Sequence, residues 1–189
     1  MFKTLFSFLL LTLLFSCTKE TEIKQIVKYN EEDFKLKQGV LFYGNLPLTG
    51  KLIRNNKTSR LQSEVDYKKG KKEGEEIVKY ADGKLYEQRF YENGIKTGIH
   101  KGWWTNGNLR FEYHFNNEGE YNGEVKEWYT NGQLMKYFHF INGKEEGSQK
   151  MWQSNGKIRA NYVAKNGDRF GLIGLKKCYS VNIIDEKIK

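Results

Sequence analysis

Three histidines are the side chains of this 189-residue sequence best suited to hold a metal ion or to move a proton. His114 and His139 each stand sixteen residues after a recurring glycine, so we expect them to occupy equivalent places in neighbouring repeats. Places two strands apart in a sheet are roughly 10 Å from each other. Zinc–nitrogen bonds are only about 2.0–2.1 Å long, so two such histidines are too distant to share one zinc. His100 falls in the opening strand of a third repeat, and we predict neither a metal site nor a pH sensor.

The sequence carries no pattern of a covalent catalyst. It has no Gly-x-Ser-x-Gly motif, and no cysteine or serine is placed with a histidine and an acid in a recognisable arrangement. Cys178, near the end of the chain, is interpreted as a structural or incidental thiol. Gly-Lys steps such as Gly70-Lys71 lack the spacing and the following helix of a phosphate-binding loop. We therefore predict a protein that is not an enzyme and needs no cofactor.

Cys17 is the residue to which the sequence assigns a modification. The hydrophobic run from Leu5 to Phe15 is too short to span a bilayer stably, as in a signal peptide. It ends in Leu14-Phe15-Ser16-Cys17, which resembles the lipobox of bacterial lipoproteins. The resemblance implies that residues 1–16 are a signal peptide and that Cys17 becomes a lipidated N-terminus, anchored by acyl chains such as palmitate. An ordinary signal peptide that happens to carry a cysteine is the alternative.

The chain is basic, with a net charge of +9 and a pI near 9.3, which would ordinarily suggest a nucleic-acid partner. An exported protein meets little nucleic acid, and the basic and acidic residues are interspersed, so we expect none. We place the protein in the cell envelope, in the outer membrane or at the cell surface, with a membrane contact through its lipid anchor. Residues 17–37 then comprise the lipidated cysteine and a polar tether.

A period of 24 residues organises the rest of the chain. We call the recurring glycines the anchor glycines, and the intervals between them are 24, 24, 25, 24 and 24 residues: Gly50, Gly74, Gly98, Gly123, Gly147 and Gly171. The position eleven residues later is aliphatic: Leu61, Leu85, Leu109, Leu134 and Ile158. The position seventeen residues later is aromatic in four of five repeats: Tyr67, Tyr91, Phe115, Phe140 and then Ala164. Positions kept in phase in this way predict a repeat architecture.

Two turn signals recur in each repeat. The first comprises Asp82-Gly83, Asn106-Gly107, Asn131-Gly132 and Asn155-Gly156, and the second comprises Lys69-Gly70, Asn93-Gly94, Asn142-Gly143 and Asn166-Gly167. We expect hairpins with type I′ turns, in which both central residues have positive φ. The strands between the turns are then antiparallel and about 5–8 residues long. One residue is inserted between Asn116 and Gly123, where we expect a local departure from the array.

These signals predict an all-β fold, an elongated antiparallel β-meander of about five 24-residue hairpin repeats that forms a single-layer twisted sheet. Residues 38–175 would form the array and residues 176–189 a C-terminal tail. Trp103, Trp128 and Trp152 lie five residues after an anchor glycine and should form a ladder. We expect the Leu/Ile and Tyr/Phe rows to lie on the same face as this ladder and to form the core with it.

Three further aromatic residues lie six residues after an anchor glycine: Tyr80, Trp104 and Tyr129. If this segment is a strand, their side chains face away from the tryptophan ladder. Exposed aromatic side chains are common anchors of binding surfaces, so these three are our candidate partner-binding residues.

The repeat resembles the bacterial MORN variant, the second MORN family, which occurs in proteins often labelled YwqK-type antitoxins. The resemblance rests on GIHKGWWTNGNL at residues 98–109, GEVKEWYTNGQL at residues 123–134 and YKKGKKEG at residues 67–74. It covers about residues 38–171, with imperfect end repeats that would act as caps. The family supports the fold strongly but supplies no catalytic residue to assign.

Two functions follow from the sequence. The first is a lipid-anchored envelope protein that binds a protein partner, either a toxin, which would make it antitoxin-like or immunity-like, or another envelope protein. The alternative is a structural or surface lipoprotein that binds a glycan or an anionic envelope polymer.

Overall fold

The computed structural model describes residues 26–174 of the chain. The predicted signal peptide, the lipidation site Cys17, Cys178 and the predicted tail therefore lie outside the described residues. Residues 26–174 form strands and turns with no helix, so no helix in this part is long and apolar enough to cross a membrane.

Sixteen strands follow one another along the chain. They are β1 (Ile26–Lys28), β2 (Phe34–Lys37), β3 (Val40–Tyr43), β4 (Leu46–Pro47), β5 (Gly50–Asn56), β6 (Leu61–Lys68), β7 (Lys71–Lys79), β8 (Leu85–Glu92), β9 (Ile95–Trp103), β10 (Leu109–Phe115), β11 (Tyr121–Trp128), β12 (Leu134–Ile141), β13 (Lys144–Glu145), β14 (Gly147–Trp152), β15 (Ile158–Lys165) and β16 (Asp168–Leu172).

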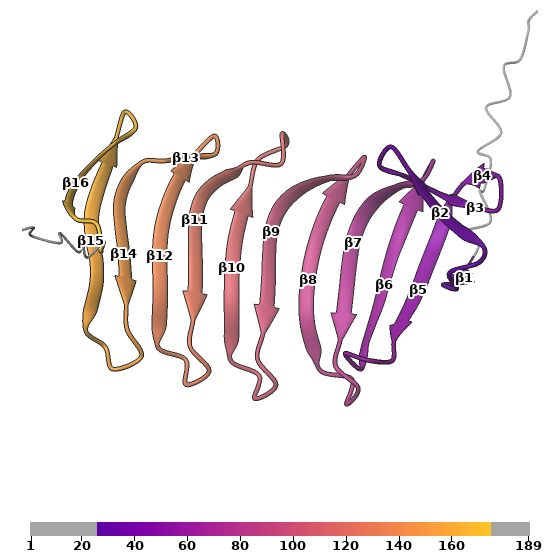
Figure 1. Cartoon of the computed structure of the whole chain (residues 1–189), viewed down its shortest axis with the longest axis horizontal. Helices are drawn as coiled ribbons and strands as arrows, with labels where there is room; N and C mark the ends of the chain where they lie inside the picture. The colour runs from indigo at the N-terminus through magenta and orange to yellow at the C-terminus, as the bar shows by residue number, and fades with distance from the viewer. Residues whose placement is uncertain (1–25, 175–189) are drawn as a thin grey trace, which may run out of the picture.

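The predicted all-β meander is confirmed. In a 13-stranded sheet, β5 to β12 and then β14 to β16 follow one another as antiparallel neighbours, and the short β13 also pairs with β12 (Figure 1). The first strand, β1, pairs in parallel with β5 and extends the sheet at its N-terminal edge. Three short strands, β2, β3 and β4, form a separate small sheet beside that end (Figure 1).

The two predicted turn signals form two different loops. In the second signal both residues have positive φ, as in Asn93-Gly94 with φ 50° and 84°, so the predicted type I′ turn is confirmed there. In the first signal only the glycine has positive φ, and the prediction was wrong. The Gly107 N–H donates to Trp104 O and the Trp104 N–H donates to Asn108 O, which closes a three-residue loop ending in a left-handed glycine.

The Asn or Asp of the first signal has a separate role in these three-residue loops. Its side-chain oxygen accepts the N–H two residues further on, as Asn106 Oδ1 does from Asn108 N at 3.1 Å. The insertion near Asn116 produces one more loop of this kind in place of a two-residue turn, because Gly119 N–H donates to Asn116 O. This is the local departure predicted there.

The anchor glycines mark irregularities in the strand pairing. Between β8 and β9, Gln88 pairs with Lys101 but Phe90 pairs with Thr97, so the β9 segment around Gly98 bulges out of the ladder. Gly98 has a φ of 66°, and the other anchor glycines also have positive φ. A left-handed residue costs a non-glycine residue about 1–2 kcal/mol, which explains why glycine recurs at this position.

The two faces of the sheet differ in burial. Position seventeen pairs with the anchor glycine, as Phe140 does with Gly123, so its aromatic residues lie on the face opposite the tryptophans. We call this face the core face, because every buried side chain of β5 to β15 lies on it: Leu52, Val65, Glu76, Glu87, Tyr91, His100, Phe111, Val125, Phe138, Gln149, Ala160, Tyr162 and Ala164. Aromatic rings on the core face contact one another across successive repeats. The ring centroids of His100 and Phe115 are 4.5 Å apart, and those of Phe115 and Tyr121 are 4.9 Å apart.

The opposite face, which we call the tryptophan face, is not the core. The tryptophan and Leu/Ile rows share it as predicted, since Trp103 pairs with Leu109 and Trp128 with Leu134. However, the tryptophans are only half-buried, and Ile158 of the Leu/Ile row is 52% exposed. Placing the Tyr/Phe row and the core on this face was wrong. In these hairpins the second strand has one extra residue between the positions eleven and thirteen residues after the anchor glycine. This bulge moves the following side chains to the opposite face of the sheet, and the sequence does not reveal it.

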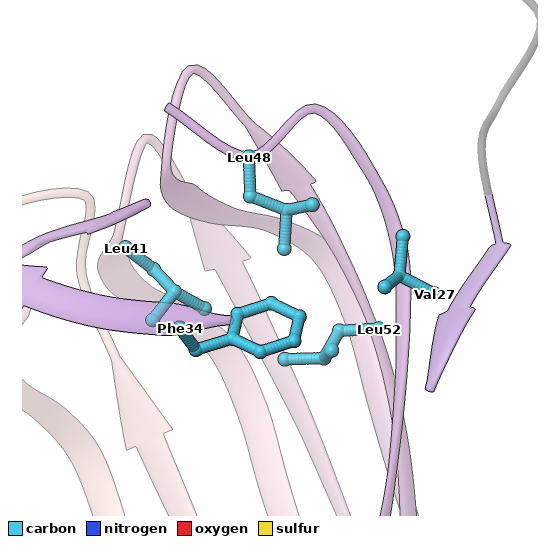
Figure 2. Packing of buried hydrophobic residues seen from close by; sticks show 5 residues of the cluster. All are labelled: Val27, Phe34, Leu41, Leu48 and Leu52. Carbon is cyan, nitrogen blue, oxygen red and sulfur yellow. The ribbon is translucent and has the colours of Figure 1, made fainter. Parts of the chain in front are cut away.

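A cap covers the N-terminal end of the core face. Val27, Phe34, Leu41 and Leu48 pack around Leu52 of β5 and form one buried cluster (Figure 2). The cap therefore begins within residues 17–37, the segment predicted as a polar tether, and the ordered structure starts before the predicted boundary at residue 38. Burying Phe34 and its neighbours is what orders this polar-looking segment.

Candidate binding surface

The three candidate residues Tyr80, Trp104 and Tyr129 occupy equivalent places, and we call them the turn-edge row. Each directly follows the last residue of a strand and directly precedes a three-residue loop, so the segment is a strand end rather than a strand. All three side chains are half-buried. They lie along one edge of the sheet, where the loops that follow β7, β9 and β11 stand side by side (Figure 1).

Each residue of the turn-edge row is hydrogen-bonded to the next repeat. Tyr80 OH donates to Trp103 O at 2.9 Å, and Trp104 Nε1 donates to Trp128 O at 3.1 Å. Tyr129 OH donates to Trp152 O at 2.9 Å. One polar atom of each ring is therefore used to hold adjacent repeats together, and what remains for a partner is the ring surface.

A hollow of about 300 Å³ lies beside Trp104. Its lining combines aromatic rings with one cation and one carboxylate: Trp104, Arg110, Phe111, Tyr113, Glu127, Trp128 and Met135. Large aromatic side chains and arginine are the residues most enriched at energetically important contacts between proteins. Of the three candidate residues, Trp104 lines this hollow, and Tyr80 and Tyr129 do not.

Arg110 connects the hollow to Tyr80 and was missed from the sequence. Its guanidinium lies 4.4 Å from the Tyr86 ring centroid and 5.7 Å from that of Trp104, and it donates to Glu87 Oε1 at 2.5 Å. The Tyr86 ring in turn meets the Tyr80 ring edge-on at 5.1 Å. Tyr86 and Arg110 both lie twelve residues after an anchor glycine, so the period shows that they are equivalent, whereas the bulge at Arg110 that allows the contact is not visible in the sequence.

Glu127 is the carboxylate of the hollow and is held from two sides. Tyr113 OH donates to its Oε1 at 3.1 Å, and Lys136 Nζ lies 3.3 Å from the same oxygen. Burial, followed by the nearby Glu127 charge, raises the pKa of the Tyr113 hydroxyl well above its usual range. Tyr113 therefore stays protonated, and its hydrogen bond holds the Glu127 side chain in the lining of the hollow.

The histidines do not assemble as a group. His100 is buried on the core face, with Nε2 3.1 Å from Phe90 N and 2.9 Å from Phe90 O. His114 and His139 lie on the tryptophan face, as their equivalent positions predicted. His139 contacts Glu146 O through Nδ1 at 3.1 Å, whereas His114 contacts a carboxylate.

That carboxylate belongs to a cluster in which ligand atoms of Glu112, His114 and Glu124 all lie within 4.8 Å of one another. Lys101 Nζ lies 3.2 Å from Glu112, and Lys126 forms a short ion pair with Glu124. Hydrogen bonds from His114 and Lys101 outweigh the effect of burial and hold the pKa of Glu112 below its usual value. The two lysines already compensate both carboxylates, and we assign no metal to this cluster.

Comparison with known families supports the repeat assignment. Three consecutive segments match the family model of the MORN repeat variant: residues 72–93, 96–117 and 121–142. The segments begin 24 and 25 residues apart, which are the intervals between Gly74, Gly98 and Gly123. No curated protein shows a significant match to the chain. The central repeats thus match the MORN repeat variant and form part of an all-β sheet.

Proposed function

We propose that the protein is a protein-binding module and that the hollow at Trp104 receives a side chain of its partner. One observation carries the proposal: an aromatic ring, the Arg110 guanidinium and the Glu127 carboxylate converge on one concave site. Such a site offers apolar area together with both signs of charge, which gives affinity and orientation at once. The Trp104 ring is also held in place by a hydrogen bond to the next repeat, so little of its side-chain freedom is lost on binding.

The setting that we propose is the cell envelope, with the chain anchored through a lipidated Cys17. The partner would be a toxin, in keeping with the antitoxin label of the resembling family, or another envelope protein. Replacing Cys17 with serine should abolish labelling by a fatty-acid analogue and release the protein from membranes. Labelling that continues in the variant would contradict the lipoprotein assignment.

A glycan is the second candidate, favoured by the Trp104 indole ring, which lines the same hollow as Glu127. Indole rings stack on sugar rings, and a carboxylate accepts hydrogen bonds from sugar hydroxyls. Binding rather than catalysis is supported because the carboxylate is engaged by Tyr113 and Lys136, with no histidine or thiol among the lining residues.

The first experiment uses residues 18–189 as bait in lysate and secreted material from the source organism, at low and at moderate salt. One dominant protein retained at moderate salt is the expected result, and its identity decides between a toxin and an envelope protein. Recovery of glycan alone, or of polymer that is lost as salt rises, would contradict protein binding and favour the second candidate.

A further inference from the structure

A second hollow, of about 530 Å³, lies between the N-terminal cap and the first repeats, away from Trp104. The cap contributes the side chains of Tyr29, Phe34, Leu36 and Leu41. The sheet contributes Tyr67 and Tyr91, the first two aromatic residues at position seventeen on the core face. The volume falls within the range of about 300–1,000 Å³ that is usual for small-ligand sites.

Cations, but no carboxylates, line this cap hollow. Arg54, Lys71 and Lys72 all reach it, while no Asp or Glu is among its lining residues. Lys72 is paired with Glu76 at 2.6 Å. Arg54 lies 3.9 Å from the Tyr29 ring centroid, and neither Arg54 nor Lys71 has an ion pair with a carboxylate of residues 26–174. The lining therefore carries positive charge that the described part of the chain does not compensate.

The apolar side of the hollow is also left uncovered. Leu36 is 72% exposed although it lies beside the buried residues Phe34 and Leu41. An exposed leucine alone is unremarkable, but here it faces the same opening as the uncompensated cations. A ligand with an apolar body and one negative group would satisfy both features together.

We propose that the cap hollow binds a small organic anion: a carboxylate or sulfonate carried on an aliphatic or aromatic body. Its charged group lies at Arg54 and Lys71, where charge-assisted hydrogen bonds hold it. Its apolar body lies against Leu36 and the aromatic side chains of the cap. The site is independent of the protein-partner site at Trp104, and it lies between the cap and the first repeats.

The test uses 8-anilinonaphthalene-1-sulfonate, an aromatic sulfonate whose fluorescence rises in apolar surroundings, with the chain from residue 18 onward. We expect binding of one molecule, weakened by at least about five-fold in Leu36→Ser and in Arg54→Gln, because each variant removes one half of the recognition. Both side chains are exposed, so the variants should keep the wild-type circular dichroism spectrum. Lys165→Gln, at the far end of the array, removes the same charge and should leave the affinity unchanged.

Competition supplies the second measurement. Octanoate should displace the probe, whereas octanamide, with the same chain and no charge, should not. Trp104→Ala should leave probe binding unchanged, which separates this site from the proposed partner site. An affinity loss below five-fold in either cap variant, or equal displacement by the two competitors, would overturn the proposal.

Discussion

Two buried polar side chains, His100 and Gln149, replace main-chain hydrogen bonds where neighbouring strands drift out of register. Both lie two residues after an anchor glycine, and each reaches the backbone of position sixteen in the preceding repeat. Gln149 Nε2 donates to His139 O at 2.8 Å, and Gln149 Oε1 accepts from His139 N at 3.1 Å. The bulge at the anchor glycine interrupts the strand pairing beside these backbone groups, and the polar side chain on the core face supplies hydrogen bonds to them there.

Gln149→Ala is therefore expected to lower the free energy of unfolding by about 1–3 kcal/mol, because the His139 N–H loses the Gln149 oxygen and the His139 carbonyl keeps only the Glu146 N–H. Urea denaturation followed by circular dichroism measures the change. Gln153→Ala is the matched control, since that side chain is exposed and a loss below about 0.5 kcal/mol is expected. Equal effects of the two substitutions would contradict the role assigned to Gln149.

His100 predicts a pH dependence of stability. Burial lowers the pKa of His100 from its usual 6.5, so the unfolded chain takes up a proton more readily than the folded one. The contribution of His100 to the free energy of unfolding should thus be fully present above pH 6.5. It should fall as the pH drops below this value, by at most about 1.4 kcal/mol per pH unit. His100→Gln, which introduces the residue found at the equivalent position 149, should flatten the slope between pH 7.5 and pH 5. An unchanged slope in this variant would mean that another group is responsible.

At the scale of elements, two loop types connect the strands at the two edges of the sheet. Two-residue type I′ turns lie at one edge, apart from the longer loop after Asn116, and three-residue loops with an Asn or Asp side-chain hydrogen bond lie at the other. Gly70 belongs to a type I′ turn that also holds the cap. Its N–H donates to Leu48 O at 2.7 Å, and its carbonyl accepts from Leu41 N at 2.8 Å.

Gly70→Ala tests this contact. A Cβ at Gly70 would lie 2.4 Å from Val40 Cγ1 and 2.7 Å from Leu41 O, whereas a Cβ at Gly83 would meet no atom within 4 Å. The two glycines have similar φ angles, 77° and 84°, so the cost of the left-handed conformation is shared. We expect Gly70→Ala to reduce the free energy of unfolding by at least about 1 kcal/mol more than Gly83→Ala, owing to overpacking. Equal losses of unfolding free energy in the two variants would contradict this, because they would mean that the cap moves away from the added methyl group without destabilising the protein.

The strands and loops also show which parts of the fold can be predicted from the sequence. The anchor period and the turn dipeptides predict the strands and their antiparallel order, because glycine and asparagine at those positions satisfy local backbone needs. The face of the Tyr/Phe row was predicted wrongly, because each bulge shifts the alternation by one residue. The cap was missed because Phe34 is isolated in a polar segment, and the cluster that buries it includes Leu52, which lies in the array and is distant in sequence. At the candidate site, Trp104 was found from its position in the repeat, while Arg110 required a bulge to reach the core face.

At the scale of the whole molecule, each repeat contacts its neighbours along one row of strands, so the array should behave as a sum of similar units. Deleting residues 75–98 removes one full period and joins Gly74 to Ile99 in the same phase as the native chain. We expect a cooperatively folded protein whose urea m-value is smaller, since less surface is exposed on unfolding. Deleting residues 75–86, about half a period, is the control and should disrupt folding because the following strands change direction and phase. A folded half-period variant, or an unfolded full-period variant, would contradict the repeat account.

The binding function rests on the ring surface of Trp104, so the most direct measurement compares three baits in one quantitative pull-down: the wild-type chain from residue 18, Trp104→Phe and Trp104→Ala. Phenylalanine keeps an aromatic surface but loses the Nε1 hydrogen bond to Trp128 O, whereas alanine loses both. The account predicts a protein partner captured by the wild type, largely retained by Trp104→Phe and lost by at least about ten-fold with Trp104→Ala, a hot-spot cost above 1 kcal/mol. Equal capture by folded Trp104→Ala would contradict it, and so would equal loss in both variants, which would make Trp104 a link between repeats rather than a contact for a partner.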